Sequence, residues 1–330
     1  WFAEHHFQPE GYECLPNLPM MAVHIAGRTK RIKIGCAFSI APMWHPLRLA
    51  EDYAMADHLT DGRLVFGVGR GYHTREVESL GGPMMDQDVN REYFEECVEV
   101  IFKAFNSRSF SHHGKHFDIP PKVPYRGYEL EVIALVPRPK YLPVECYQPI
   151  VSANPRGLRF MAKHGIKGVM GGGAGPGGAN YEVVRAFQEV QAEFGNETKL
   201  GENLVVGLDI HLGKTREQAI KEVQPYFEEN IKMFAPLGFT PRLSGAQLMA
   251  TNDPDDAAFA AIPSTEEFID NGHYQFGTPQ YLIDEIGKLQ DTYPGLEQVT
   301  VQPVIPLPKA QMLDQMQWFA EEVMPEFIHS

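Results

Sequence analysis

The sequence is built on one repeated pattern, in which a short apolar run is followed by a longer amphipathic stretch. The runs have the length and β-branched content of buried strands, and the stretches have apolar residues at helical spacing. Because parallel strands need helical crossovers, the pattern predicts an α/β protein with a parallel sheet. We expect strands at 31–40, 63–68, 144–153, 167–170, 204–212 and 298–304. We expect helices at 45–60, 90–105, 155–164, 181–194, 215–234, 279–292 and 309–324.

The strands and two interruptions of the pattern favour a closed barrel over an open, doubly wound sheet. Residues 1–7 look like the end of a further buried strand. Segments at about 106–143 and 235–276 break the repeat, as the insertions of an elaborated barrel do. We therefore expect one (β/α)8 TIM-barrel domain over residues 1–330, with two long insertions and its first strand absent from this sequence. The natural protein is then expected to begin upstream of Trp1.

The composition limits the partners and the compartment. The formal net charge of −14 argues against nucleic acid, whose binding depends on clustered Lys and Arg. No stretch approaches the ~18 consecutive apolar residues of a transmembrane helix, so we expect no membrane span. The four cysteines lie far apart without a CxxC pair, which predicts reduced thiols in a cytoplasmic protein rather than disulfides or a zinc site.

In a barrel, catalytic groups lie at the carboxyl ends of the strands, and the first such end here is Glu4-His5-His6. A histidine at this place is suited to acid/base chemistry, because its pKa is near neutrality. The same three residues are also a conceivable metal site, or one histidine is an ordinary core residue. Adjacent strand residues point to opposite faces, so Glu4 and His6 should share a side and His5 should face away. That makes a three-ligand metal site poor, and we expect none.

The second strand end is the glycine-rich segment 67–71, followed by Tyr72. Its spacing does not match GxGxxG, so it is a weak dinucleotide signal. Glycines allow a flat or phosphorylated ligand to approach the backbone, and Arg70 offers a planar cation for phosphate. A sharp turn with a surface arginine is the simpler alternative.

Four further groups of residues have both a functional and a structural interpretation. Residues 152–155 precede a helix and either cap it or bind an anion there. Residues 171–178 (GGGAGPGG) either hold a phosphate or form a mobile connection. The histidines of the first insertion have metal-like spacing but are more often solvated. The methionine pairs either line an apolar pocket or fill the core. These histidines and pairs are His112, His113, His116, Met20–Met21, Met43–Trp44 and Met84–Met85.

Several motifs resemble the bacterial-luciferase-like flavin-dependent monooxygenases. The opening WFAEHHF is followed by HPLRLAEDYAMADHLTDGRLVFGVGRGY over residues 45–72, in the family's order. The closing GTPQYLIDEIGKL and MLDQMQWFAEEVMPEF resemble its last helices. The resemblance covers nearly the whole chain. It implies a (β/α)8 barrel that uses reduced FMN and O2, through a flavin C4a-peroxide, to oxygenate a substrate.

The resemblance also implies site residues. His5 matches the catalytic histidine and His6 its neighbour, while Ala37–Phe38 falls where a non-prolyl cis peptide lies beneath the flavin ring. Gly69 stands where light-emitting members carry a reactive cysteine, which makes light emission doubtful without affecting flavin binding. We expect the cofactor to contact Ala37, Phe38, Gly69, Arg70, Tyr72, Ser152, Ala153, Gly171 and Gly172.

The functional prediction is an FMN-dependent monooxygenase acting on a small organic substrate, with His5 as acid/base. Its expected partners are O2, a separate flavin reductase and a second copy of the chain in a homodimer. The alternatives are an F420-dependent hydride-transfer oxidoreductase, a non-catalytic flavin-binding protein and a metal-dependent barrel hydrolase. The sequence does not identify the substrate.

Overall fold

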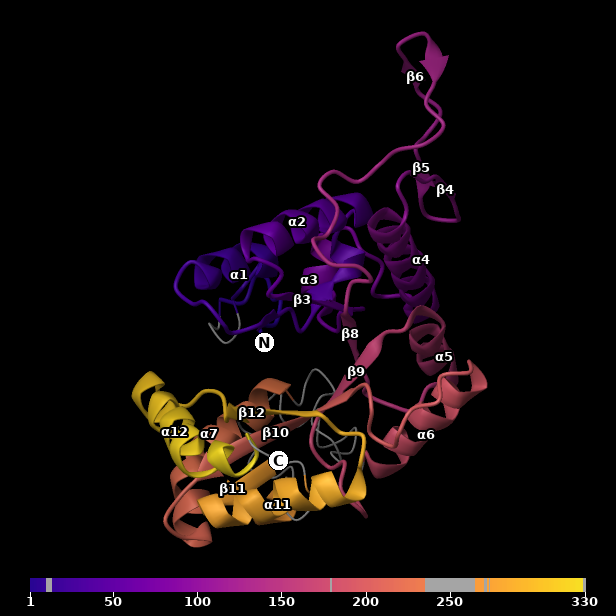
Figure 1. Cartoon of the computed structure of the whole chain (residues 1–330). Helices are drawn as coiled ribbons and strands as arrows, with labels where there is room; N and C mark the ends of the chain where they lie inside the picture. The colour runs from indigo at the N-terminus through magenta and orange to yellow at the C-terminus, as the bar shows by residue number, and fades with distance from the viewer. Residues whose placement is uncertain (10–13, 179, 235–264, 270–271, 273, 329–330) are drawn as a thin grey trace. The chain divides into compact units, whose positions relative to one another are not determined.

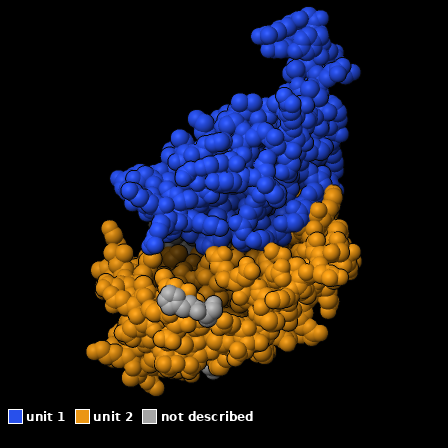
Figure 2. All heavy atoms as spheres, in the orientation of Figure 1, with its two compact units in different colours: residues 1–149, 164–167 blue, residues 150–163, 168–330 orange. Residues whose placement is uncertain are grey.

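The structure is a computed structural model that describes residues 1–9, 14–178, 180–234, 265–269, 272 and 274–328. The chain divides into two compact units, which Figure 2 colours separately. Unit 1 is residues 1–149 with 164–167, and unit 2 is residues 150–163 with 168–330. Each unit is described by itself.

Unit 1 is built on a parallel sheet around strand β3 (Leu64–Gly69), whose six residues are all buried. Its neighbours are β1 (Ile34–Gly35) and β8 (Cys146–Pro149), and β2 (Ser39–Ile40) pairs further along β3. The strand expected at 31–40 is therefore two short strands. The strand expected at 144–153 ends at Pro149, where the ring removes the N–H needed to continue a ladder.

The first residues of the chain add to this sheet. Phe2 forms a parallel bridge with Cys36, its N–H donating to the Gly35 carbonyl at 2.9 Å and its carbonyl accepting from the Ala37 N–H at 2.6 Å. Glu4, His5 and His6 follow this bridge directly. The structure has this single bridge in place of the strand expected over residues 1–7, and the segment after it is called the first strand end below.

The described α-helices that flank the strands of unit 1 are α1 (Leu18–Ala26), α2 (Pro46–Leu59), α3 (Thr74–Ser79) and α4 (Gln87–Asn106) (Figure 1). Tyr53 of α2, Phe66 of β3 and Phe105 of α4 form an aromatic core, with ring centroids 4.6 to 5.5 Å apart. The sequence interpretation missed α1, although Asn17 caps it by accepting the Met20 N–H at 2.8 Å.

The insertion at 106–143 forms short strands, as expected. β4 (His112–His113) pairs with β5 (Asp118–Ile119), and β6 (Pro124–Tyr125) pairs with β7 (Tyr128–Glu129). Arg126 and Gly127 turn the second hairpin with positive φ angles of 51° and 87°, the combination that a type I′ turn requires. This hairpin stands away from the rest of unit 1 (Figure 1).

Unit 2 is organised around β10 (Leu204–Leu212), which pairs in parallel with β9 (Lys167–Met170), β11 (Tyr274–Gly277) and β12 (Gln298–Pro303). Among its described residues, the α-helices are α5 (Pro155–His164), α6 (Tyr181–Glu193), α7 (Arg216–Phe234), α10 (Thr265–Ile269), α11 (Pro279–Thr292) and α12 (Lys309–Glu322). Phe227 of α7 packs edge-on against Tyr274 and Phe276 of β11, with centroids 4.7 and 5.8 Å away. The aromatic residues of β11 therefore fill this core.

The second insertion, expected at 235–276, lies mostly outside the described residues. Its described end contains α10 and β11, so the prediction of an insertion running to residue 276 is wrong there. Strand β11 has four residues, too few for a periodic signal in the sequence. Among the described helices, none combines the length and the apolar character needed to cross a membrane.

Candidate functional site

The strand end in unit 1 separates Glu4 from His5, as the alternation of strand side chains predicts. The buried Glu4 carboxylate accepts hydrogen bonds from the Ile40 N–H at 2.9 Å and the Trp44 indole N–H at 2.8 Å. The His6 Nε2 lies 3.0 Å from the same carboxylate. Glu4 therefore ties the chain start to β2 and fixes the His6 ring, on the side away from His5.

His5 is 3% exposed and contacts two side chains through its two ring nitrogens. Nδ1 lies 3.2 and 3.3 Å from the carboxylate oxygens of Glu76, and Nε2 lies 3.0 Å from the Tyr72 hydroxyl. The His5 ring also meets the Tyr72 ring edge-on, with centroids 5.5 Å apart. His5, which we expected to be catalytic, and Tyr72, which we expected to contact the cofactor, therefore lie in direct contact. Glu76 contacts His5 from its other ring nitrogen.

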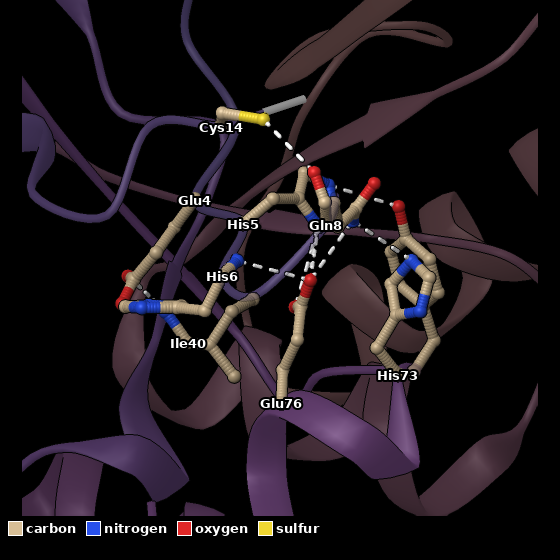
Figure 3. A network of polar contacts seen from close by, with 9 residues as sticks. Glu4, His5, His6, Gln8, Cys14, Ile40, His73 and Glu76 are labelled. Atoms are coloured by element: carbon tan, nitrogen blue, oxygen red, sulfur yellow. Dashed lines mark hydrogen bonds and ion pairs between the residues drawn. The ribbon is translucent and has the colours of Figure 1, made fainter. Parts of the chain in front are cut away.

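Glu76 collects hydrogen bonds from the first strand end (Figure 3). Besides His5, the His6 backbone N–H donates to it at 3.0 Å and the Gln8 amide at 2.9 Å. Burial would raise the pKa of Glu76, but the hydrogen bonds from His5, Gln8 and His6 outweigh it and lower the pKa from 4.5 to about 2. The carboxylate is therefore ionised at every pH at which the protein would work.

The position of Glu76 follows from the packing of the next residue. Val77, 1% exposed, packs in a small apolar cluster with Ile40 and Met84, and Met43 lies against it. This anchors α3 against β2 and directs Glu76 to the strand end. Met43 and Met84 fill this part of the core, while Met20 and Met85 are 72% and 80% exposed.

The other expected cofactor residues of unit 1 lie around β3. The Ala37–Phe38 peptide is cis, as the resemblance implied. A Cβ added at Gly69 would lie 3.2 Å from Phe38 Cβ and 3.3 Å from the Ile40 side chain, so these neighbours pack closely against Gly69. The Arg70 guanidinium donates to the Gln87 side-chain oxygen at 2.9 Å and is half-buried.

The remaining expected cofactor residues belong to unit 2. Ser152 and Ala153 are exposed before α5, and the residue that caps this helix is Asn154, which accepts the Gly157 N–H at 3.1 Å. Gly172 is buried and its carbonyl accepts from the Asn180 amide at 2.8 Å, whereas an added Cβ on Gly171 would meet nothing within 4 Å.

The glycine-rich loop after β9 is held by its backbone. The Gly173 N–H donates to the Gly272 carbonyl at 2.8 Å, and the Gly178 N–H donates to the Gly175 carbonyl at 2.9 Å. Residues 173–178 border a cavity of about 400 Å³, together with Arg216, Gln275 and Lys288 among others. The Lys288 ammonium is paired with Glu285 at 2.5 Å.

Ligand atoms of His5, His73 and Glu76 lie within 4.8 Å of one another, which is close enough to consider a metal ion. Both ring nitrogens of His5 and the carboxylate of Glu76 already form hydrogen bonds. A tetrahedral zinc site would need the two nitrogens and the oxygen about 2 Å from one centre. We therefore interpret these residues as a hydrogen-bonded network.

The histidines of the first insertion have structural partners. His112 lies 3.0 Å from both Glu96 and Lys103, and His113 pairs with Asp118 at 2.6 Å. Glu96 also accepts the backbone N–H groups of residues 115–117. These contacts fix the β4–β5 hairpin to α4.

Comparison with known proteins finds a matching family model and similar sequences. The family model described as luciferase-like monooxygenase matches residues 1–294. Limonene 1,2-monooxygenase of Rhodococcus erythropolis is 24% identical over 340 residues, which cover 99% of this chain and 76% of the relative. An uncharacterised protein, y4vJ of Sinorhizobium fredii, is 36% identical over 121 residues, or 37% of this chain.

Solved structures share the fold. The oxygenating constituent of 3,6-diketocamphane monooxygenase from Pseudomonas putida, in complex with FMN, has a TM-score of 0.72 at 20% identity, covering 99% of this chain and 87% of that one. The F420-dependent tetrahydromethanopterin reductase of Methanopyrus kandleri has a TM-score of 0.66 at 17% identity, covering 99% and 90%. The prediction of the α/β TIM-barrel class is confirmed by this likeness.

The fold and the matched family model define the class as that of the luciferase-like TIM-barrel proteins. The chain belongs to the luciferase-like monooxygenase family. It spans 33% and 62% of the lengths of two curated relatives, the Sinorhizobium fredii proteins y4vJ and y4wF.

The sequence interpretation missed Glu76, Gln8 and His73 as members of the site. Glu76 lies four residues after Tyr72, at the start of the helix that follows the glycine-rich strand end. A buried acidic residue in that place is the signal that could have identified it, but 70 residues separate it from the His6 backbone that it binds.

Proposed function

We propose that this chain is the oxygenase of a flavin-dependent system, which uses reduced FMN and O2 to oxygenate a small organic substrate. The observation that carries the proposal is the buried His5, held between Glu76 and Tyr72 at a strand end, in a chain of the luciferase-like monooxygenase family. When bound, reduced FMN supplies the electrons that activate O2.

The residues of unit 1 fit a flavin. Because Gly69 has no side chain, Phe38 and Ile40 pack directly against β3, and the flat ring is proposed to lie against the backbone of Ala37–Phe38 and Gly69. Arg70 is the cation for the phosphate, since its planar guanidinium suits bidentate contact with phosphate oxygens. Ser152, Ala153, Gly171 and Gly172 remain proposed as further cofactor contacts in unit 2.

His5 is the acid/base group of this proposal, and His6 supports it. An imidazole has an ordinary pKa of about 6.5, so it can accept or return a proton near neutral pH. The burial of His5 keeps bulk water from its ring, and an active site that excludes water protects reactive intermediates.

An F420-dependent hydride transfer is the second candidate function. It is favoured by the likeness to the F420-dependent reductase described above and to an F420-dependent secondary alcohol dehydrogenase, with a TM-score of 0.69 at 16% identity. Titration of the purified protein with FMN, reduced FMN and F420, followed by fluorescence, separates the two candidates. Tighter binding of F420 and its reduction by a secondary alcohol would replace the monooxygenase proposal.

The partners are proposed from the same relatives. A flavin reductase is expected because the Pseudomonas putida structure is named an oxygenating constituent. We also propose that both units form one domain and that two copies of the chain form a homodimer. Native mass spectrometry with FMN tests the homodimer and the flavin stoichiometry together.

The decisive experiment compares FMN with riboflavin, which lacks the phosphate. Arg70→Ala is expected to weaken binding of reduced FMN at least tenfold and to leave riboflavin binding unchanged. The matched control is Arg108→Ala, since Arg108 is an exposed arginine of the same unit. Equal loss for both flavins would remove the phosphate role of Arg70, and no flavin binding by the unmodified protein would remove the proposed function.

A further inference from the structure

Three titratable side chains of α4 and the β4–β5 hairpin form a hydrogen-bonded chain. Lys103 Nζ lies 3.0 Å from His112 Nδ1, and His112 Nε2 lies 3.0 Å from Glu96 Oε1. His112 is 7% exposed, whereas Lys103, in the last turn of α4, is exposed. The chain therefore leads from a largely buried carboxylate, through a buried imidazole, to an amine at the surface.

Glu96 fixes the protonation of this chain. Its carboxylate also accepts the backbone N–H groups of residues 115–117 at 2.9 to 3.1 Å. Burial would raise the pKa of Glu96, but the hydrogen bonds from His112, Phe117 and His116 outweigh it and lower the pKa. An ionised carboxylate can only accept hydrogen bonds, so His112 Nε2 carries the hydrogen and donates it.

The tautomer of His112 decides how it meets Lys103. In a neutral imidazole with its hydrogen on Nε2, the other nitrogen has a lone pair and can only accept. A lysine ammonium can only donate, so Lys103 donates to His112 Nδ1. The imidazole is therefore placed to take a proton from the amine, and Glu96 is placed to balance the charge of the imidazolium that forms.

The turn between β4 and β5 leaves room for the pair of His112 and Glu96. A Cβ added at Gly114 would lie 2.5 Å from His112 Nε2 and closer still to Glu96 Oε1. A larger residue would have to displace one of the two groups. The Gly114 N–H donates to the Phe117 carbonyl at 2.9 Å and closes the turn. The hairpin therefore holds the imidazole between the carboxylate and the amine of α4.

We propose that Lys103 is an acylation site, at which an acyl thioester modifies the amine, with His112 as the general base and Glu96 as a positioning residue. His112 Nδ1 takes one proton from the ammonium and passes it to water. The electron pair of the nitrogen forms a bond to the thioester carbonyl carbon, the C–S bond breaks, and its electron pair stays on sulfur. The sulfur leaves as a thiol with the second proton that the nitrogen loses. The product is an uncharged amide on α4.

The place of Lys103 in the helix explains why a base is needed. An amine attacks a carbonyl carbon through its unprotonated form, and an adjacent base activates it. The last turn of a helix has the opposite effect, since its carbonyl groups favour the charged ammonium. Reactivity of Lys103 above that of other exposed lysines is therefore expected to come from His112.

Two other lysines of the same insertion are internal controls. The exposed Lys115 ammonium pairs with Glu92 at 2.5 Å, which raises the pKa of Lys115. Lys122 is exposed, and the described part of the chain gives it no ion-pair partner. The three amines therefore differ in whether an imidazole, a carboxylate or neither faces them. The expected order of acylation is Lys103 first, then Lys122, then Lys115.

The first test needs no variant. The whole protein is incubated with S-acetyl-N-acetylcysteamine at pH 8, and acetylation of each lysine is followed over time by peptide mass spectrometry. This thioester is uncharged, so the formal net charge of −14 does not repel it. Lys103 is expected to react at least tenfold faster than Lys122. A Lys103 rate equal to or below the Lys122 rate would overturn the proposal.

Variants then separate proton transfer from accessibility. His112→Gln removes the base, and any loosening of the hairpin would leave Lys103 more exposed. A purely structural role therefore predicts an unchanged or faster Lys103 rate. The proposal predicts a rate that falls at least tenfold, to about that of Lys122, while the Lys122 rate stays unchanged.

Glu96 is tested in the same way. Glu96→Gln should slow Lys103 by a smaller factor than His112→Gln, because the base remains but the charge that balances its imidazolium is lost. Glu96→Asp should restore much of the wild-type rate, since it restores that charge. An unchanged Lys103 rate in both His112→Gln and Glu96→Gln would overturn the proposal.

Discussion

The segment around His5 and the glycine-rich loop after β9 are held in place by different kinds of hydrogen bond. In unit 1 the contacts are between side chains, with Glu76 accepting from His5, His6 and Gln8. In unit 2 the glycine-rich loop is held by backbone hydrogen bonds and by close backbone approach. The first arrangement should be sensitive to the loss of a side chain, and the second to the addition of one.

The largest effect is expected for Glu76→Ala. It leaves three donors, among them the buried His5, without their acceptor, and breaking a buried pair of this kind costs about 3 kcal/mol. The free energy of unfolding from urea titration measures it. Glu92→Gln, in an exposed ion pair with Lys115, should cost less than about 1 kcal/mol. Equal costs for the two variants would contradict the contrast between the regions.

Acid should weaken the same network in the unmodified protein. The pKa of Glu76 is depressed from 4.5 to about 2, so its contribution to stability is complete above about pH 4.5 and is lost as the pH falls toward 2. The difference in urea midpoint between wild type and Glu76→Gln should shrink over that window. A difference that stays constant from pH 5 to pH 2 would show that the charge of Glu76 does not stabilise the fold.

In unit 2 the sensitive change is an added methyl group. The Cβ of Gly178→Ala would lie 2.2 Å from the Gly173 carbonyl oxygen, so the loop must move, at a cost of about 1–3 kcal/mol. At Gly171 the new Cβ would meet nothing within 4 Å, so Gly171→Ala should unfold at the wild-type urea concentration. Under the proposed function, Gly171→Ala should nevertheless weaken FMN binding. If Gly171→Ala lost more stability than Gly178→Ala, the close contact between Gly178 and the Gly173 backbone would not be what fixes this loop.

The smallest effect is expected at the start of α5. Asn154→Ala removes the acceptor of the Gly157 N–H and should cost about 1 kcal/mol. Ser152→Ala, at an exposed position two residues earlier, should change stability by less than about 0.5 kcal/mol. Thermal unfolding of the pair decides which of the two side chains caps the helix, and a greater loss at Ser152 would reverse the assignment.

Elements with strong local signals were predictable from the sequence. Strands β9 and β10 and helices α5 and α11 have the expected bounds, because each has a clear period or a clear apolar run between turn residues. Helix α1 was missed because nearly all of its nine residues are apolar, which hides the helical period. Its cap at Asn17 was the remaining signal.

The site was predictable as far as its strand ends, and less so in its contacts. The opposite facing of Glu4 and His5 follows from the alternation of strand side chains, and the structure confirms it. The pairing of His5 with Glu76 joins residues 71 positions apart, so no local pattern contains it. It depends on Val77 packing against Ile40, a tertiary contact.

One of the four cysteines, Cys14, can serve as a labelling site beside the His5 network. Cys36, Cys97 and Cys146 are buried, and burial raises the pKa of each. Cys14 is exposed, and its Sγ donates to the Gln8 carbonyl at 3.5 Å, beside the network (Figure 3). A thiol-reactive fluorophore should therefore attach at one defined place in the folded protein, without any engineered cysteine. Its emission would follow local changes around Gln8, and labelling of the other three thiols would time global unfolding.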